Sequence, residues 1–120
     1  MDYYVTFMAG IFRSVRFGAS SAHGKANMIR FNYFKSMNAF SFDEATNMYS
    51  VNFDNFQAAI NSLSKKILTL QGDGDYEGVS QLFDKMGMVG PELQATLDRV
   101  NDANIPKDIV FKQGTEVLGL

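Results

Sequence analysis

The sequence predicts a mainly α-helical fold: a long N-terminal helix packed with three shorter helices, plus a small β-hairpin and a short C-terminal strand. Apolar residues recur at three- and four-residue steps through much of the 120-residue chain, and glycine or proline stands near the ends of these runs. Aromatic and polar residues alternate between positions 40 and 53, which indicates a hairpin. With 46% hydrophobic residues and eleven phenylalanines, the chain can form one modest core.

Residues 3 to about 37 are predicted to form one continuous helix. Its apolar line has the helical period and consists of Tyr4, Met8, Ile11, Val15, Ala19, Ala22, Ala26, Ile29 and Tyr33. Such a helix would be about 50 Å long, which exceeds the roughly 35 Å diameter of a compact domain of this size. The helix must therefore bend near Gly18–Ser21 or belong to something larger. We interpret Gly18 and Gly24 as positions of close backbone packing rather than as a break.

Alternating residues predict the hairpin, which must pack on the helices because two strands alone are marginally stable. Its alternating members are Phe40, Phe42, Tyr49, Val51 and Phe53. A strand-like run at Asp108–Lys112 predicts the short C-terminal strand.

Three shorter helices follow the hairpin. They are predicted over residues 54–71, 76–86 and 91–104. Asp54 and Gln57 resemble a capping box at the first start, and Gly72 and Gly87 suit positions just past helix ends. Pro91 suits a first helical position.

Composition limits the classes of partner. The net charge is −2, so the chain lacks the basic excess of a nucleic-acid binder. No apolar stretch reaches the ~20 residues that span a bilayer, and no signal peptide is recognisable. The absence of cysteine excludes disulfides and thiolate metal sites. We therefore expect a cytoplasmic protein without nucleic-acid or membrane partners.

A polar row is the best functional clue. In a continuous helix, steps of three and four residues would align Arg13, Arg16, Ser20, His23, Asn27 and Arg30. His23 is the only histidine, and a lone helical histidine is commonly a surface or structural residue. Beside these neighbours it could instead donate a hydrogen bond to a developing oxyanion. The arginines could bind phosphates or form ion pairs elsewhere in the fold.

Three other site patterns are weak. Gly18–Ala26 has the wrong glycine spacing for a phosphate loop. Asp73–Asp84 resembles a calcium loop, but a helical pattern runs through it, which favours helix capping by acidic residues. A zinc site needs three or four ligands, and one histidine without cysteine cannot build a His-rich or Cys-rich site.

Three stretches resemble the dipeptidyl peptidase III family of zinc peptidases, and most of all its bacterial branch. They are Arg16–Phe34, Leu70–Gly78 and Ile105–Phe111. The most specific match is the Ala-His-x-x-Ala element at Ala22–Ala26. The resemblance covers essentially all 120 residues but only the C-terminal part of a much longer family architecture.

The resemblance implies that residues 1–120 are a single segment, the C-terminal part of the helical catalytic upper lobe of a larger peptidase. The family's zinc ligands lie on a His-Glu-x-x-Gly-His helix, with a further Glu, upstream of this region. The histidine matching His23 faces the cleft, binds substrate and stabilises the transition state, which makes it the predicted catalytic residue. Asn27, Arg30, Arg13 and Arg16 are the predicted substrate-binding residues of the cleft wall.

The assignment of family site residues to this sequence differs or stays open at some positions. Asn27 stands where animal and fungal members have an arginine, so this position carries an amide in place of their cation. A basic residue near the C-terminus also serves the family site, and both Lys107 and Lys112 are candidates.

The resemblance therefore implies that a full-length parent is a zinc-dependent dipeptidyl peptidase that releases N-terminal dipeptides from short peptides. The expected partners are a peptide substrate and the rest of the parent chain. The 120 residues alone are expected to bind no metal and to have no peptidase activity. The alternative is a stand-alone, non-enzymatic helical module that binds a partner or anion through the polar row. A calcium-loop protein is a third possibility.

Overall fold

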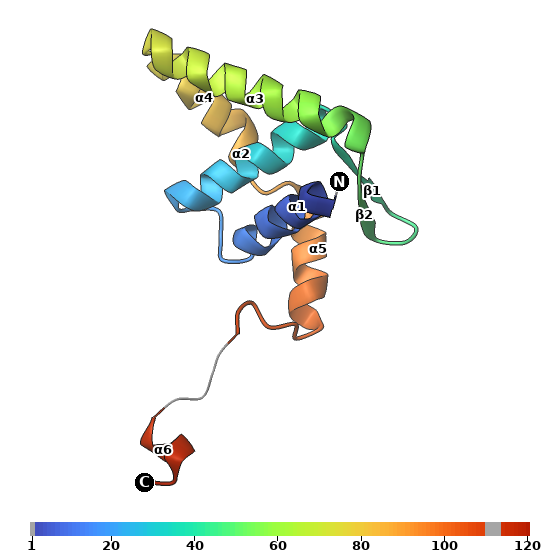
Figure 1. Ribbon diagram of the computed structural model, residues 1–120, viewed down its shortest axis with the longest axis vertical. Helices are drawn as coiled ribbons and strands as arrows, with labels where there is room; N and C mark the ends of the chain where they lie inside the picture. The colour runs from blue at the N-terminus through green and yellow to red at the C-terminus, as the bar shows by residue number, and fades with distance from the viewer. Residues whose placement is uncertain (1, 110–113) are drawn as a thin grey trace.

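The computed structural model describes residues 2–109 and 114–120, which form a mainly α-helical fold with one hairpin (Figure 1). The elements are α1 (Asp2–Val15), α2 (Ala22–Ser36), β1 (Phe40–Asp43), β2 (Met48–Val51), α3 (Phe53–Asp73), α4 (Tyr76–Met86), α5 (Pro91–Asp102) and α6 (Thr115–Leu118). The predicted fold class, mainly α with a small hairpin, is confirmed.

Helix α2 is the centre of the fold, because it packs against α1, α3, α4 and β1. Figure 1 shows it between α1 on one side and the α3–α4 pair on the other. Its Met28 is fully buried, as is Phe56 of α3. The Asn32 side-chain amide donates to the carbonyl oxygens of Met86 and Met88, both at 2.9 Å, and so ties α2 to the chain that leaves α4.

Aromatic residues form two clusters that join these elements. In the first, the Phe56 ring lies 4.5 Å from Tyr4 and 5.4 Å from Phe34, between ring centroids, and connects α1, α2 and α3. The second surrounds Tyr49 and connects α1 and α2 to the hairpin, with Phe12, Phe31, Phe40 and Phe42. Most of the phenylalanine content of the chain therefore serves packing, since aromatic pairs add stabilisation beyond the area they bury.

The prediction of one continuous N-terminal helix is wrong. Helix α1 ends at Val15 and α2 begins at Ala22. Gly18 has φ +107°, a conformation that L side chains rarely adopt and that no α-helix contains. Folding back lets α1 bury Met8, Ile11 and Val15 in the same core that α2 enters, which a straight rod could not do. The glycine that we interpreted as a packing residue is the break.

Two predicted helix ends are displaced. Helix α3 starts at Phe53 with Asn52 at its N-cap, so the Asp54–Gln57 capping box is wrong. The Gln57 side-chain oxygen instead accepts a 2.7 Å hydrogen bond from the Tyr4 hydroxyl of α1. The helix ends at Asp73, and the residue just past its end is Gly74, in the left-handed conformation with φ 62°, and not Gly72.

Other ends agree with the sequence. Pro91 occupies the first turn of α5, and Gly87 follows α4.

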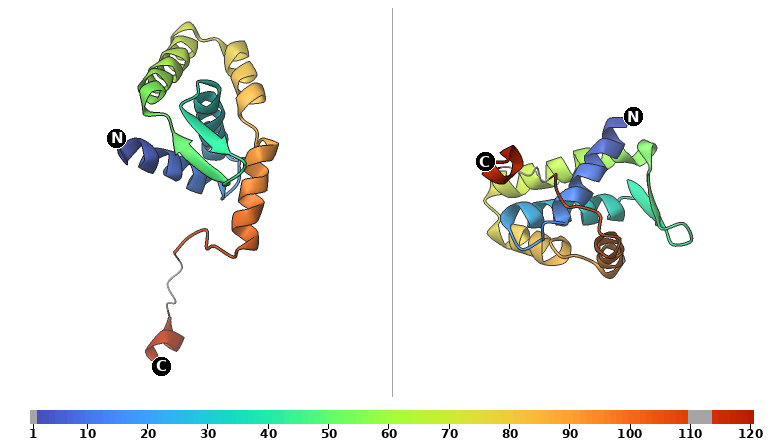
Figure 2. Two further views of the ribbon diagram at one scale, coloured as in Figure 1. Left: turned by 90° about the vertical axis from the view of Figure 1, so that its right-hand side faces the viewer. Right: turned by 90° about the horizontal axis from the view of Figure 1, so that it is seen from below.

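The predicted hairpin is present. Its strands are antiparallel, with Phe40 opposite Val51 and Phe42 opposite Tyr49. The Thr46 hydroxyl donates to the Asp43 carboxylate across the turn at 2.8 Å and lowers the pKa of that carboxyl. Figure 2 (left) shows the hairpin between α3 and α5.

Phe53 belongs to α3 and not to the second strand. The predicted strand at Asp108–Lys112 falls mostly on residues 110–113, outside the described residues, and its first two residues are not in a strand.

None of the helices within residues 2–109 and 114–120 is long and apolar enough to cross a membrane.

Candidate functional site

The first turn of α2 holds His23 in place through its backbone. Ser21 is the N-cap residue, and its hydroxyl accepts a 3.1 Å hydrogen bond from the Gly24 N–H. The preceding loop packs directly on this turn: a Cβ at position 24 would lie 2.3 Å from the Gly18 carbonyl oxygen and 2.8 Å from the Ala19 Cα. Position 24 therefore needs glycine, because no side-chain rotation could relieve a contact with backbone.

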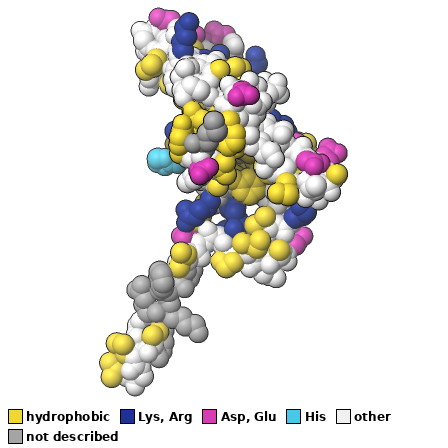
Figure 3. All heavy atoms as spheres, turned by 45° about the vertical axis from the view of Figure 1, so that its right-hand side comes forward, with side chains coloured by type: hydrophobic (Ala, Val, Ile, Leu, Met, Phe, Trp, Pro, Cys, Tyr) yellow, Lys and Arg dark blue, Asp and Glu magenta, His cyan; other side chains and the backbone are white. Residues whose placement is uncertain are grey.

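His23 is exposed on the outer side of α2. Figure 3 shows its side chain standing out at the edge of the molecule. One and two turns further along the helix lie Asn27 and Arg30, and the Arg30 Nη1 donates to the Asn27 Oδ1 at 2.9 Å. The structure thus brings together the second half of the predicted polar row, with a guanidinium group fixed by an amide.

An apolar pocket lies beside this row. It has a volume of about 330 Å³ and lies between α2, α3 and α4. Ala26 and Arg30 of α2 form one wall, and the opposite wall includes Leu63, Ile67 and Phe83. Arg30 therefore places a cation at the edge of an apolar cavity, which is a combination suited to a ligand with an apolar side chain and a carbonyl or carboxylate group.

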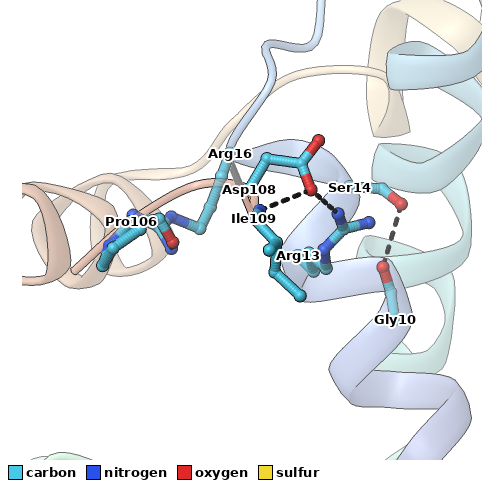
Figure 4. Close-up of polar contacts among 7 residues, drawn as sticks. All are labelled: Gly10, Arg13, Ser14, Arg16, Pro106, Asp108 and Ile109. Carbon is cyan, nitrogen blue, oxygen red and sulfur yellow. Dashed lines mark hydrogen bonds and ion pairs between the residues drawn. The ribbon is translucent and has the colours of Figure 1, made fainter. Parts of the chain in front are cut away.

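Arg13 and Arg16 do not lie in line with His23, because the chain turns between α1 and α2. The Arg13 guanidinium forms an ion pair with Asp108 at 2.8 Å (Figure 4). Arg16 donates to the main-chain carbonyl oxygens of Pro106 at 3.0 Å and of Ile105 at 2.5 Å. The continuous six-residue row is thus a wrong prediction, and the two arginines bind the segment that follows α5. Ser20 is exposed in the loop.

The arrangement on α2 can donate hydrogen bonds to an oxygen-bearing ligand. Within the described ranges, no three His, Cys, Asp or Glu side chains cluster closely enough to hold a metal ion. The acidic residues that resemble a calcium loop, at Asp73–Asp84, include a helix cap. Asp75 is the N-cap of α4, and its carboxylate accepts a 2.8 Å hydrogen bond from the Gly78 N–H. This is the helix capping that the sequence favoured.

Sequence reasoning missed a second pocket, formed by α1, the hairpin and α5 with a volume of about 460 Å³. Tyr49 lies in its wall, where burial raises the pKa of the phenol although a hydrogen bond with Thr96 partly opposes the shift. The only sequence signal for this pocket was that a continuous helix would be longer than a compact domain, which left a bend near Gly18–Ser21 as one of two options.

No protein-family model matches the chain. Its fold matches the structure of DPP III from Caldithrix abyssi with a TM-score of 0.82 and 37% sequence identity, over 88% of this chain and 20% of that one. The structure of dipeptidyl-peptidase III from Corallococcus sp. strain EGB matches with a TM-score of 0.81 and 36% identity, over 89% of this chain and 19% of that one. This chain is a dipeptidyl peptidase III-like segment. The resemblance inferred from the Ala-His-x-x-Ala element is confirmed.

A curated relative of this dipeptidyl peptidase III-like segment is named Nudix hydrolase 3 from Arabidopsis thaliana. It is 41% identical over 106 residues, which are 88% of this chain and 14% of that protein. The chain thus spans about a fifth or less of the length of the proteins it matches. The name of the plant protein describes a much longer chain and assigns no activity to this segment.

Proposed function

We propose that this chain is the C-terminal part of the helical catalytic lobe of a dipeptidyl peptidase, and that it supplies a histidine that binds substrate and the transition state. The longer protein would release N-terminal dipeptides from short peptides, with zinc held by residues outside this chain. The observation that carries the proposal is the exposed imidazole of His23, presented by an Ala-His-x-x-Ala element on the outer side of α2. The likeness to two dipeptidyl peptidase III structures supports it.

The proposed role follows from what each side chain can donate. The His23 imidazole N–H would donate to the carbonyl oxygen of the scissile bond, most strongly when negative charge develops there. Arg30, held by Asn27, would bind a carbonyl or carboxylate group of the peptide further along α2. We leave Arg13 and Arg16 out of the substrate site, because their guanidinium groups already bind the 105–108 segment.

The test uses the longer protein with its metal bound. His23→Phe should lower kcat by roughly 10²–10³-fold, the usual effect of losing one oxyanion donor, while peptide binding measured by calorimetry weakens less. Arg30→Gln should instead raise KM with a smaller change in kcat. Lys25→Ala is the matched control, because Lys25 is exposed on the same turns of α2 but faces away from the row.

Full turnover by the His23→Phe variant would refute the assignment. Metal-dependent release of dipeptides by the purified 120 residues would also contradict it, because the chain would then be an enzyme by itself.

The alternative function is a stand-alone binding module that uses the same exposed side chains. The reading frame upstream of this chain separates the two. A His-Glu-x-x-Gly-His motif in frame supports the peptidase, whereas its absence together with binding of a partner through His23 and Arg30 supports the module.

A further inference from the structure

The pocket of about 460 Å³ lies on a different part of the molecule from the His23 row. Its size falls within the ~300–1,000 Å³ range typical of ligand pockets. The walls are almost entirely apolar, and the lining includes Phe12 from α1, Phe31 from α2, Tyr49 from β2 and Val100 from α5. Figure 3 shows hydrophobic side chains gathered over the middle of this face, with basic side chains along their lower edge.

Part of this lining is open to solvent in the isolated chain. Val5 is 48% exposed and Ile105 is 51% exposed, although both line the pocket. Apolar surface of this kind, with a polar edge, is characteristic of a contact region.

Two arginines form the polar edge, and one of them has an unused donor. Arg13 and Arg16 both line the pocket. The Nη atoms of Arg16 bind two main-chain carbonyls, but its Nε is buried and has no hydrogen-bond partner among the described residues. This Nε is shielded from solvent, so no outside atom reaches it in this conformation, but both Nη atoms keep a second N–H and their two carbonyl partners are neutral. The positive charge of Arg16 at the pocket edge therefore lacks an acidic acceptor among the described residues.

The length of the similar proteins indicates the source of that acceptor. This chain corresponds to 19–20% of the two dipeptidyl peptidase III structures it matches, so some four-fifths of each lies outside the matched region. An apolar pocket with a positive edge is complementary to a segment that carries a bulky apolar side chain next to a carbonyl or carboxylate oxygen.

We propose that the pocket between α1, the hairpin and α5 is filled by an apolar segment of the longer protein that lies outside these 120 residues, with an oxygen of that segment accepting from the Arg16 guanidinium. The proposal rests on the proposed function, which makes this chain part of a longer protein. It gives Arg13 and Arg16 a role in assembly of the lobe, and not in contact with substrate.

The test uses the absence of cysteine from this chain. Ser50→Cys introduces a thiol at an exposed position in the pocket wall, and Glu44→Cys introduces one at the exposed hairpin turn outside the pocket. Both variants are made in the 120-residue chain and in the longer protein, and labelling by a maleimide is followed by mass spectrometry of the tryptic peptide. The expected result is that the thiol at position 50 reacts at least tenfold more slowly in the longer protein, while the thiol at position 44 reacts equally in both.

A second readout identifies the occupant. A photo-crosslinking amino acid at position 5 in the longer protein should crosslink to a residue outside this chain. The crosslinked residue should lie near an oxygen-bearing side chain or an unpaired main-chain carbonyl of its own segment. Arg16→Ala should restore faster labelling at position 50, whereas Lys85→Ala, a change to a basic residue of α4 away from the pocket, should not.

Three results would overturn the proposal: equal labelling of position 50 in both proteins, a crosslink within the 120 residues, or concentration-dependent protection in the isolated chain, which would mean that a second copy fills the pocket.

The proposed function is judged separately. His23→Phe should abolish most turnover without changing the labelling rate, so a longer protein that shows protection at position 50 but releases no dipeptide refutes the function alone. Proof that the 120 residues are the complete protein would overturn both.

Discussion

Gly24→Ala tests the local geometry that presents His23, because the same substitution has opposite effects at two helical glycines. Alanine gains about 1 kcal/mol over glycine in a helix interior. At position 24 the added methyl would lie 2.3 Å from the Gly18 carbonyl oxygen and 2.8 Å from the Ala19 Cα, both of which belong to the backbone. Overpacking of this kind costs roughly 1–3 kcal/mol, and two backbone contacts place the cost at the upper end.

We therefore expect Gly24→Ala to lower the free energy of unfolding by about 1–2 kcal/mol. Gly10→Ala is the matched control, because a Cβ built at that position of α1 has no atom within 4 Å apart from those of its chain neighbours and of the adjacent helix backbone. It should raise the free energy of unfolding by roughly 0.5–1 kcal/mol. The assay is urea denaturation of the 120-residue chain, followed by circular dichroism. A stabilised Gly24→Ala variant would refute the reasoning, since a continuous helix through residues 16–21 gains from alanine at both positions.

Further predictions concern the core, the α2 anchor and the hairpin. Phe56→Ala should cost about 3–5 kcal/mol in urea denaturation, because a fully buried ring leaves a cavity; a cost below about 1 kcal/mol would contradict its place in the core. Asn32→Ala should cost about 1–2 kcal/mol, since two carbonyls, one of them partly buried, lose their donor, and loss of amide protection after α4 measured by hydrogen exchange would locate the effect. Because the hydrogen bond from Thr46 lowers the pKa of Asp43, its stabilising contribution is present above the ordinary aspartate pKa and disappears as the pH falls through the folded value. The NMR chemical shifts of the hairpin amides should change on acidification of the unsubstituted 120-residue chain but not of the Asp43→Asn variant. Identical pH titrations of the two proteins would contradict this prediction.

Local features of the structure could be predicted from the sequence. Apolar periodicity identified the buried side of α1, and alternation identified the hairpin, although not the pairing of its strands. Pro91 and Gly87 marked helix ends because their backbone preferences act within a few residues. These signals depend on the chain near each residue and not on the rest of the fold.

Features that depend on distant partners could not be predicted. Gly18 is compatible with a helix as well as with a turn, and the choice depends on whether α1 gains more by folding back onto the core than by extending. The partners of Arg13 and Arg16 lie 89 to 95 residues away, so spacing along one helix gave them the wrong neighbours. His23, Asn27 and Arg30 stayed together because they occupy one unbroken helix, which is why that half of the predicted site lies on one face.

The most direct test is a crystal structure of the longer protein with an uncleavable peptide analogue bound. We predict that an imidazole nitrogen of His23 lies about 2.6–3.2 Å from the carbonyl oxygen at the scissile position, with the Arg30 guanidinium against the same peptide. An imidazole that points away from the peptide, or that is covered by another part of the protein while the peptide binds elsewhere, would contradict it.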